Sequence, residues 1–234
     1  MPAVSRSFAV ASACLALLLT ACGGSDKPKP TATPNPEITA AANADTDGNK
    51  CARAADPGKQ TRDKLAKPDE ELDASRTYVA TVKTNCGTFQ ITLDSERAPK
   101  TGGSFKYLAD QGFYNGLLIH RIVPGFVFQG GDPQGTGEGG PGYTIEEAPP
   151  KDLKYDKYVV AMAKTGQEPA GTSGSQFFVV TGPDAEQLTP DYALLGKVTS
   201  GMDVADKIGA IVTDPRTDFP DDPVLIESIT VAEA

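Results

Sequence analysis

Short stretches of alternating apolar and polar residues dominate the chain after residue 76. Tyr78, Ala80 and Val82 occupy every second position, which is typical of a half-buried β-strand. Residues 85–87 supply a turn, and the strand-like pattern resumes at residues 88–93. Apolar runs separated by Gly and Pro predict further strands at residues 117–123, 126–128, 158–163, 176–180, 194–198 and 224–231.

Two other segments carry apolar residues at helical spacing. The first begins at Pro99, which suits the first turn of a helix, and ends at Gly112. The second covers residues 204–211. Many short strands with two helices indicate a mainly β fold, and we expect residues 76–234 to form a closed antiparallel barrel.

The N-terminal residues have a different composition. Arg6 precedes an apolar run at residues 8–20 that is too short to span a bilayer and is typical of a secretory signal peptide. The run ends in Leu-Thr-Ala-Cys at residues 19–22, which resembles the lipobox of bacterial lipoproteins. This resemblance implies removal of residues 1–21 and a lipid anchor on Cys22. The alternative is an ordinary signal peptide with an unrelated cysteine.

Residues 22–75 have the composition of a linker. They are rich in Pro, Ala, Thr and charged residues and have few large apolar side chains, so we expect a disordered tether. Within it, the charge-rich residues 59–73 favour a short solvated helix. Cys51 and Cys86 either form a disulfide or remain free thiols, because the sequence does not show whether they are close.

Charge and residue types exclude several kinds of function. The chain has 22 Lys and Arg against 31 Asp and Glu, a formal net charge of -9, which disfavours nucleic acid as a partner. A single His and scattered Cys offer no metal site.

The lipid anchor expected on Cys22 also implies a location. We expect the protein at the outer face of the cytoplasmic membrane, or at the outer membrane if the envelope has one. We expect a monomer.

The stretch at residues 120–132 is the most informative in the chain. It reads as two strands joined by a Pro-Gly corner. Alternation places Ile119 and Val123 on the face of Arg121, and His120 on the opposite face as a buried hydrogen-bonding residue. Arg keeps its charge and has five donors, so it suits fixed donation within an apolar cleft.

Several blocks together resemble the cyclophilins. They are HRIVPGFVFQGGD at residues 120–132, GTG at residues 135–137 and GSQFF at residues 174–178, with APKT at residues 98–101 and LGKV at residues 195–198. The resemblance implies an eight-stranded antiparallel β-barrel capped by two α-helices, with the active groove on its outer face. It implies a peptidyl-prolyl cis-trans isomerase that acts on proline-containing exported proteins without a cofactor.

The resemblance also assigns site residues. Arg121 matches the catalytic arginine, Phe126 a wall of the proline pocket and Gln129 the group that binds the substrate carbonyl. The matching substrate-binding residues line the pocket or the path of the peptide: Val127, Gly135, Thr136, Ala163, Lys164, Gln176, Phe178, Leu188 and Tyr192. Gln187 stands where many members have an aromatic residue, often Trp, so we expect weak cyclosporin binding.

Rival interpretations rest on weaker patterns. Residues 135–140 fit G-x-G-x-x-G, but Pro141 and Gly142 cannot open the helix that a dinucleotide site needs. Residues 171–175 do not form the nucleophile elbow of a serine hydrolase. Two alternatives stay open: a cyclophilin-like module that binds proline peptides or acts as a chaperone with little turnover, and a purely structural envelope protein.

Overall fold

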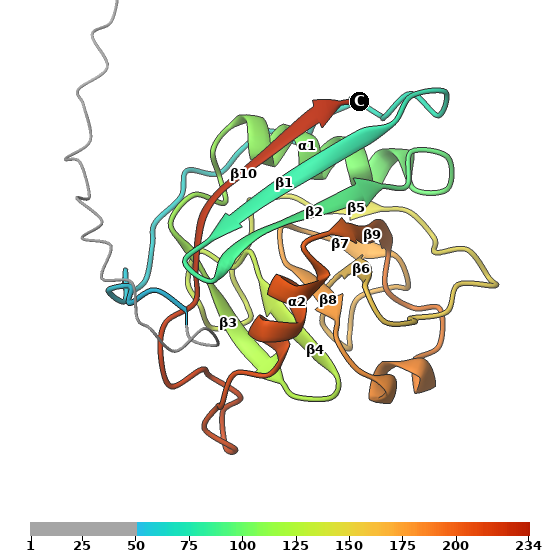
Figure 1. The fold of residues 1–234 in the computed structure, drawn as a ribbon. Helices are drawn as coiled ribbons and strands as arrows, with labels where there is room; N and C mark the ends of the chain where they lie inside the picture. The colour runs from blue at the N-terminus through green and yellow to red at the C-terminus, as the bar shows by residue number, and fades with distance from the viewer. Residues whose placement is uncertain (1–50) are drawn as a thin grey trace, which may run out of the picture. The chain divides into compact units, whose positions relative to one another are not determined.

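The computed structural model describes residues 51–234, and their core is a closed barrel of antiparallel strands. The expected signal peptide, Cys22 and the first part of the expected tether lie outside the described residues. Around the barrel the strands run in the order β1, β10, β3, β4, β8, β6, β9 and β2, and β1 pairs with β2 to close the circle (Figure 1). The fold class expected from the sequence is confirmed.

The barrel strands are short and match the predicted runs. Their bounds are β1 Tyr78–Thr84, β2 Gly87–Leu93, β3 Leu117–Val123, β4 Val127–Gly130, β6 Val159–Met162, β8 Phe177–Val180, β9 Leu194–Ser200 and β10 Leu225–Glu233. Two further strands, β5 (Ile145–Glu146) and β7 (Thr172–Ser173), pair outside the barrel, and a 3-10 helix covers Pro183–Gln187. This small pair was not expected from the sequence, because two-residue strands carry no detectable periodicity.

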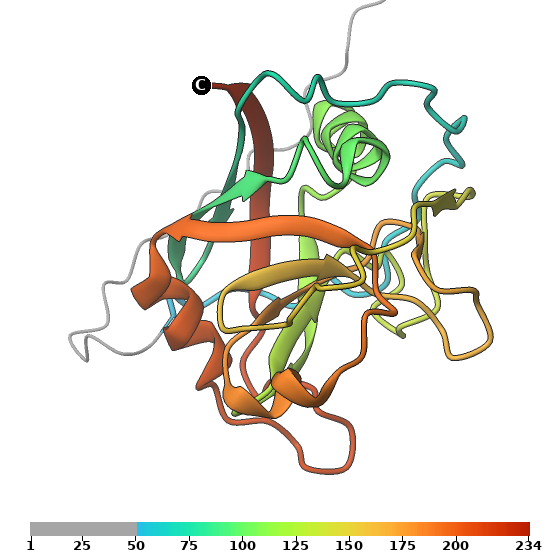
Figure 2. The same ribbon diagram turned by 90° about the vertical axis from the view of Figure 1, so that its right-hand side faces the viewer.

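Two helices cover the barrel. Helix α1 spans Pro99–Asp110 and α2 spans Met202–Gly209, and Figure 2 shows them at separate ends of the barrel. Phe105 of α1 packs its ring edge against Phe177 at a centroid distance of 5.8 Å, and both side chains are fully buried. Aromatic side chains in contacts of this kind fill the interior of the barrel. The pairing of the strands fixes the register of the residues on its outer face.

Residues 51–75, here called the N-terminal strap, lie along the barrel in irregular extended form (Figure 1). Backbone N–H groups of Gln60 and Leu65 donate to Pro133 O at 2.8 Å and to Pro141 O at 2.9 Å. Leu72 is 5% exposed and packs in the core. The expectation of a free tether is therefore wrong for the strap, and so is the helix at residues 59–73.

Glycines on α1 make room for the strap. A side chain at Gly102 would collide with Leu72, and one at Gly103 would collide with the backbone of Glu70. The strap is thus held by a few apolar anchors and backbone hydrogen bonds, which a low overall apolar content does not reveal.

A disulfide joins the start of the strap to the β1–β2 turn. It links Cys51 and Cys86 across a sequence separation of 35 residues. The open question between a disulfide and two free thiols is thus answered in the structure by the disulfide. Closing a loop of this length is worth about 4 kcal/mol in the chain-entropy account.

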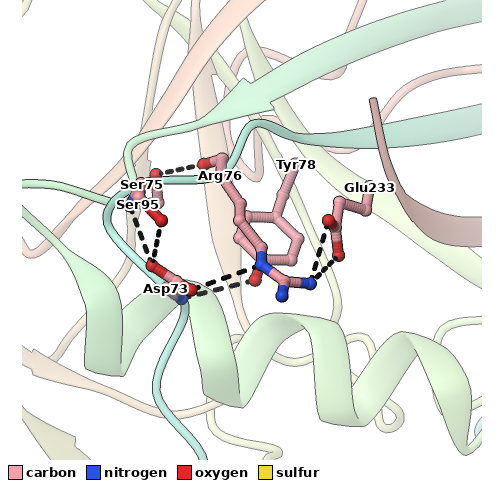
Figure 3. Close-up of polar contacts among 6 residues, drawn as sticks. All are labelled: Asp73, Ser75, Arg76, Tyr78, Ser95 and Glu233. Atoms are coloured by element: carbon pink, nitrogen blue, oxygen red, sulfur yellow. Dashed lines mark hydrogen bonds and ion pairs between the residues drawn. The ribbon is translucent and has the colours of Figure 1, made fainter.

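A polar cluster holds the other end of the strap (Figure 3). Arg76 donates from Nη1 to both carboxylate oxygens of Glu233, at 2.9 and 2.7 Å, and its Nε lies 3.3 Å from Asp73 Oδ2. Ser95 Oγ donates to Arg76 O at 2.8 Å. These ion pairs are half exposed, so they fix the chain direction more than they add stability.

Among residues 51–234, no helix has the length and apolar character needed to cross a bilayer.

Candidate active site

Arg121 lies on the outer face of the β3–β4 hairpin. Its register partner on β4 is Gln129, and Val123 pairs with Val127 next to the connecting corner. Gly125 has a φ of 81° at that corner, a conformation that favours glycine. The side chain of Arg121 is 37% exposed. The hairpin therefore presents the guanidinium beside Gln129 of β4.

A β-bulge at His120 alters the predicted alternation of β3. Ile119 pairs with Gly130 and Arg121 pairs with Gln129, so His120 has no partner on β4. Ile119 is fully buried in the core with Ile122. The expectation that Ile119 shares a face with Arg121 is therefore wrong, because one extra residue in a strand reverses the alternation.

His120 is buried, as expected, at 4% exposure. Neither ring nitrogen meets strict hydrogen-bond geometry with a described residue, but a contact with the Leu118 backbone acts to raise the pKa of His120 against the larger effect of burial, so the expected hydrogen bonding stays a prediction. Burial lowers the pKa of His120, which keeps the imidazole neutral near pH 7.

A cluster of apolar side chains adjoins the hairpin. Val127 and Phe178 are buried within it at 2% and 5% exposure, and four partly buried side chains pack against this cluster. Those four are Phe126, Ala163, Leu188 and Tyr192. The structure thus brings together the predicted wall of the proline pocket from β4, β8 and the segments after β6 and β8.

Tyr192 is held in place by a second tyrosine. Its ring meets Phe178 edge to face at a centroid distance of 5.3 Å. Tyr155 Oη donates to Tyr192 O at 2.8 Å and accepts from Tyr192 N at 2.9 Å. Burial raises the pKa of Tyr155, so the hydroxyl stays protonated and can donate. Two hydrogen bonds and an aromatic contact therefore hold Tyr192 against the apolar cluster.

Two glutamines line the next part of the groove. Gln129 Nε2 donates to Gln176 Oε1 at 2.8 Å, and Gln176 Nε2 donates to Gly137 O and Gly139 O, each at 2.9 Å. Both side chains border a groove of about 540 Å³. An amide nitrogen has two hydrogens, so Gln129 keeps one for a substrate carbonyl.

The loop that carries Gly135 and Thr136 is organised by Asp132. This carboxylate is 1% exposed and accepts N–H bonds from Gln134 at 2.7 Å, Thr136 at 2.9 Å and Gly137 at 2.6 Å. Buried acceptors satisfied by several backbone donors hold a loop tightly. The predicted substrate-contact residues of this loop therefore have a defined position beside the groove.

Lys164 contributes less surface than the sequence suggested. Its side chain is only 4% exposed, with Nζ 2.7 Å from Asp191 Oδ2 and 5.6 Å from the centre of the Tyr192 ring. The ammonium group also donates to Glu168 O at 3.1 Å. Lys164 thus supports the pocket wall and has little side-chain area left for a peptide.

A larger open hollow of about 630 Å³ lies near Arg76, away from these residues. Its lining includes none of the predicted site residues. Among the described residues, no group of His, Cys, Asp and Glu could hold a metal ion.

A comparison with known protein families identifies the family of the chain. Residues 79–231 match the model of the family described as "Cyclophilin type peptidyl-prolyl cis-trans isomerase/CLD". The chain belongs to the cyclophilin family. That match covers both helices and all of the barrel except the first residue of β1 and the last two residues of β10.

Curated cyclophilins from bacteria are similar over most of their length. The chain is 40% identical over 175 residues to "Peptidyl-prolyl cis-trans isomerase A" of Mycobacterium tuberculosis, covering 67% of this chain and 93% of the relative. It is 40% identical over 170 residues to "Peptidyl-prolyl cis-trans isomerase B" of Streptomyces anulatus, covering 65% and 95%. These names and the family match identify the cyclophilin as a peptidyl-prolyl cis-trans isomerase.

A solved cyclophilin has the same fold. The crystal structure of a Cryptosporidium parvum cyclophilin type peptidyl-prolyl cis-trans isomerase in the presence of the dipeptide Ala-Pro superposes with a TM-score of 0.61 at 30% identity. The match covers 66% of this chain and 98% of the other.

Sequence reasoning missed one residue of this cyclophilin's site. Arg121 Nε donates to Asp218 Oδ2 at 3.1 Å, although the two residues are 97 positions apart. Asp218 lies in an irregular segment before β10 and belongs to no motif. Only the folded chain places it beside Arg121.

Proposed function

We propose that Arg121 is the group through which this cyclophilin lowers the barrier to rotation about X-Pro bonds, with the pocket of Phe126, Val127 and Phe178 holding the proline ring. The observation that carries the proposal is the position of Arg121, whose side chain is 37% exposed, in register with Gln129 on the hairpin that adjoins the apolar cluster.

The chemistry needs a fixed donor and no covalent step. Resonance in the C–N bond produces a barrier of about 18 to 20 kcal/mol. Twisting the bond localises a lone pair on the prolyl nitrogen, and a guanidinium N–H can donate to it. Because this contact forms only as the amide twists, it stabilises the transition state more than the ground state.

The pocket and Gln129 supply the restraint. The apolar wall binds the proline ring on one side of the bond, and the free N–H of Gln129 can donate to the carbonyl on the other side. Binding both sides restricts the bound amide to the rotation itself. Neutral His120 takes no part, because its side chain is buried at 4% exposure.

The test is the cis-to-trans exchange rate of a short X-Pro peptide with the full-length protein and with Arg121→Ala. We expect the variant to lose about 99% of kcat/KM, since a missing transition-state donor costs about 2.7 to 4 kcal/mol. Arg97→Ala serves as control, because Arg97 pairs with Asp94 on the surface. Nearly full activity in a folded Arg121→Ala protein would refute the role. A folded parent that binds proline peptides without accelerating exchange would favour the binding module instead.

The proposal includes a place in the cell. We propose that Cys22 carries the lipid anchor and that the clients are exported proteins with slow prolines. Support comes from the lipobox-like residues 19–22 and from the Cys51–Cys86 disulfide, which suits an oxidising compartment. If Cys22→Ala left the protein in the membrane fraction, the anchor would lie elsewhere.

A further inference from the structure

The contact between Arg121 and Asp218 gives the guanidinium a defined orientation. Arg121 Nε donates to Asp218 Oδ2 at 3.1 Å, and this is its sole side-chain hydrogen bond among the described residues. The guanidinium is planar with five N–H donors. Fixing Nε–H therefore fixes the plane and leaves the terminal nitrogens free to donate.

Asp218 is itself anchored at two backbone points. Its N–H donates to Asp214 O at 2.8 Å, and its carbonyl accepts from the N–H of Ile122 at 2.9 Å. Ile122 follows Arg121 directly on β3, so the carboxylate is tied to the strand that carries the guanidinium. The Asp218 backbone is thus bonded to β3, and its carboxylate is bonded to the Arg121 side chain on the same strand.

The backbone of Asp218 is unusual for a residue other than glycine. Its φ is 61°, in the left-handed region that Asp and Asn tolerate better than most residues. The surrounding loop, residues 213–220, is closed by a bridge between Thr213 and Pro220 and by a bond from Asp214 N to Phe219 O at 2.9 Å. The turn therefore directs the Asp218 carboxylate toward β3.

We propose that Asp218 is a positioning residue for the isomerase reaction, which orients Arg121 so that its terminal N–H groups face the prolyl nitrogen. This inference rests on the role proposed above for Arg121. Without the carboxylate the side chain samples other rotamers, and fewer of them can donate to the twisted amide. The variant therefore stabilises the transition state less well but binds the ground-state peptide equally well, so kcat decreases while KM changes little.

Two variants test the proposal in full-length protein. Asp218→Asn removes the charge and tolerates the left-handed backbone, and Asp218→Gly removes the side chain without backbone strain. Both groups are about a third exposed, so we expect a modest loss in kcat, about threefold for Asn and somewhat more for Gly. The matched control is Asp214→Asn, which removes the same charge from the same loop, where the carboxylate pairs with Arg216.

Two readouts separate positioning from a general effect on folding. The Nε–H signal of Arg121 in NMR should exchange with water faster in Asp218→Asn and stay unchanged in Asp214→Asn. In an Arg121→Ala background, Asp218→Asn should cause no further loss, because Asp218 acts through Arg121.

The outcomes are distinct. Unchanged or increased kcat in Asp218→Asn, with Arg121→Ala inactive, would overturn the positioning role and leave the role of Arg121 intact. Full activity in Arg121→Ala would overturn the role of Arg121 itself. Equal losses in Asp218→Asn and Asp214→Asn would attribute the effect to loop charge and also overturn the proposal.

Discussion

Replacement of both cysteines of the Cys51–Cys86 disulfide should weaken the fold without abolishing it. The perturbation is Cys51→Ala with Cys86→Ala, which removes the cross-link between strap and barrel. The barrel keeps its strands and both helices, because none of them includes Cys51 or Cys86.

The magnitude follows from the size of the closed loop. For a sequence separation of 35 residues, the chain-entropy relation gives about 13 cal/mol/K, or about 4 kcal/mol at 25 °C. With a slope near 2 kcal/mol/M for urea, the midpoint should fall by about 2 M. Mobility of the strap in the folded variant would reduce this value.

Urea unfolding, followed by tyrosine fluorescence and by far-UV circular dichroism, measures the effect. The parent protein under reducing conditions should behave like the double variant, and the variant itself should not respond to reductant. A midpoint shift below about 0.5 M would refute the reasoning, since the disulfide would then restrain the unfolded chain hardly at all.

Two further predictions concern buried polar groups. Asp132→Asn should raise KM and lower the free energy of unfolding by about 3 kcal/mol, because an NH2 group replaces one of the two oxygens that together accept three backbone N–H bonds. Peptide kinetics and urea unfolding measure both, and Glu227→Gln at an exposed position of β10 should change neither. His120 has a lowered pKa and is the single His of the chain. The unfolded state therefore binds its proton first as pH falls below about 6.5, and stability decreases from there downward. His120→Gln should flatten this decrease in unfolding measured from pH 7.5 to 5, and an unchanged slope would contradict the assignment.

The barrel could be predicted from sequence because its strands and helices carry strong local patterns. Alternation at Tyr78, Ala80 and Val82 and the opening proline of α1 depend on neighbouring residues alone. The pocket was predictable for another reason. Phe126, Val127 and Phe178 fall in two compact runs, 120–132 and 174–178, which the resemblance to cyclophilins marks together. The resemblance assigned Ala163, Leu188 and Tyr192 from outside these runs.

The features that the sequence did not predict depend on contacts between distant parts of the chain. The strap has too few apolar residues to look folded, yet Leu72 finds space above Gly102 on α1. The bulge at His120 changes the alternation by one residue, and no turn signal marks it. Asp218 reaches Arg121 only because the 213–220 loop folds back on β3.

The disulfide also determines how mechanical load would enter the molecule. Cys51 is bonded covalently to Cys86 in the turn between β1 and β2. Tension applied from the N-terminal side therefore passes through a covalent bond into the first hairpin. This tension bypasses the strap. Without the disulfide, the hydrogen bonds of the strap to Pro133 and Pro141 would break one after another. As long as the cysteines stay oxidised, tension on Cys51 would therefore load the β1–β2 hairpin before it loads the strap.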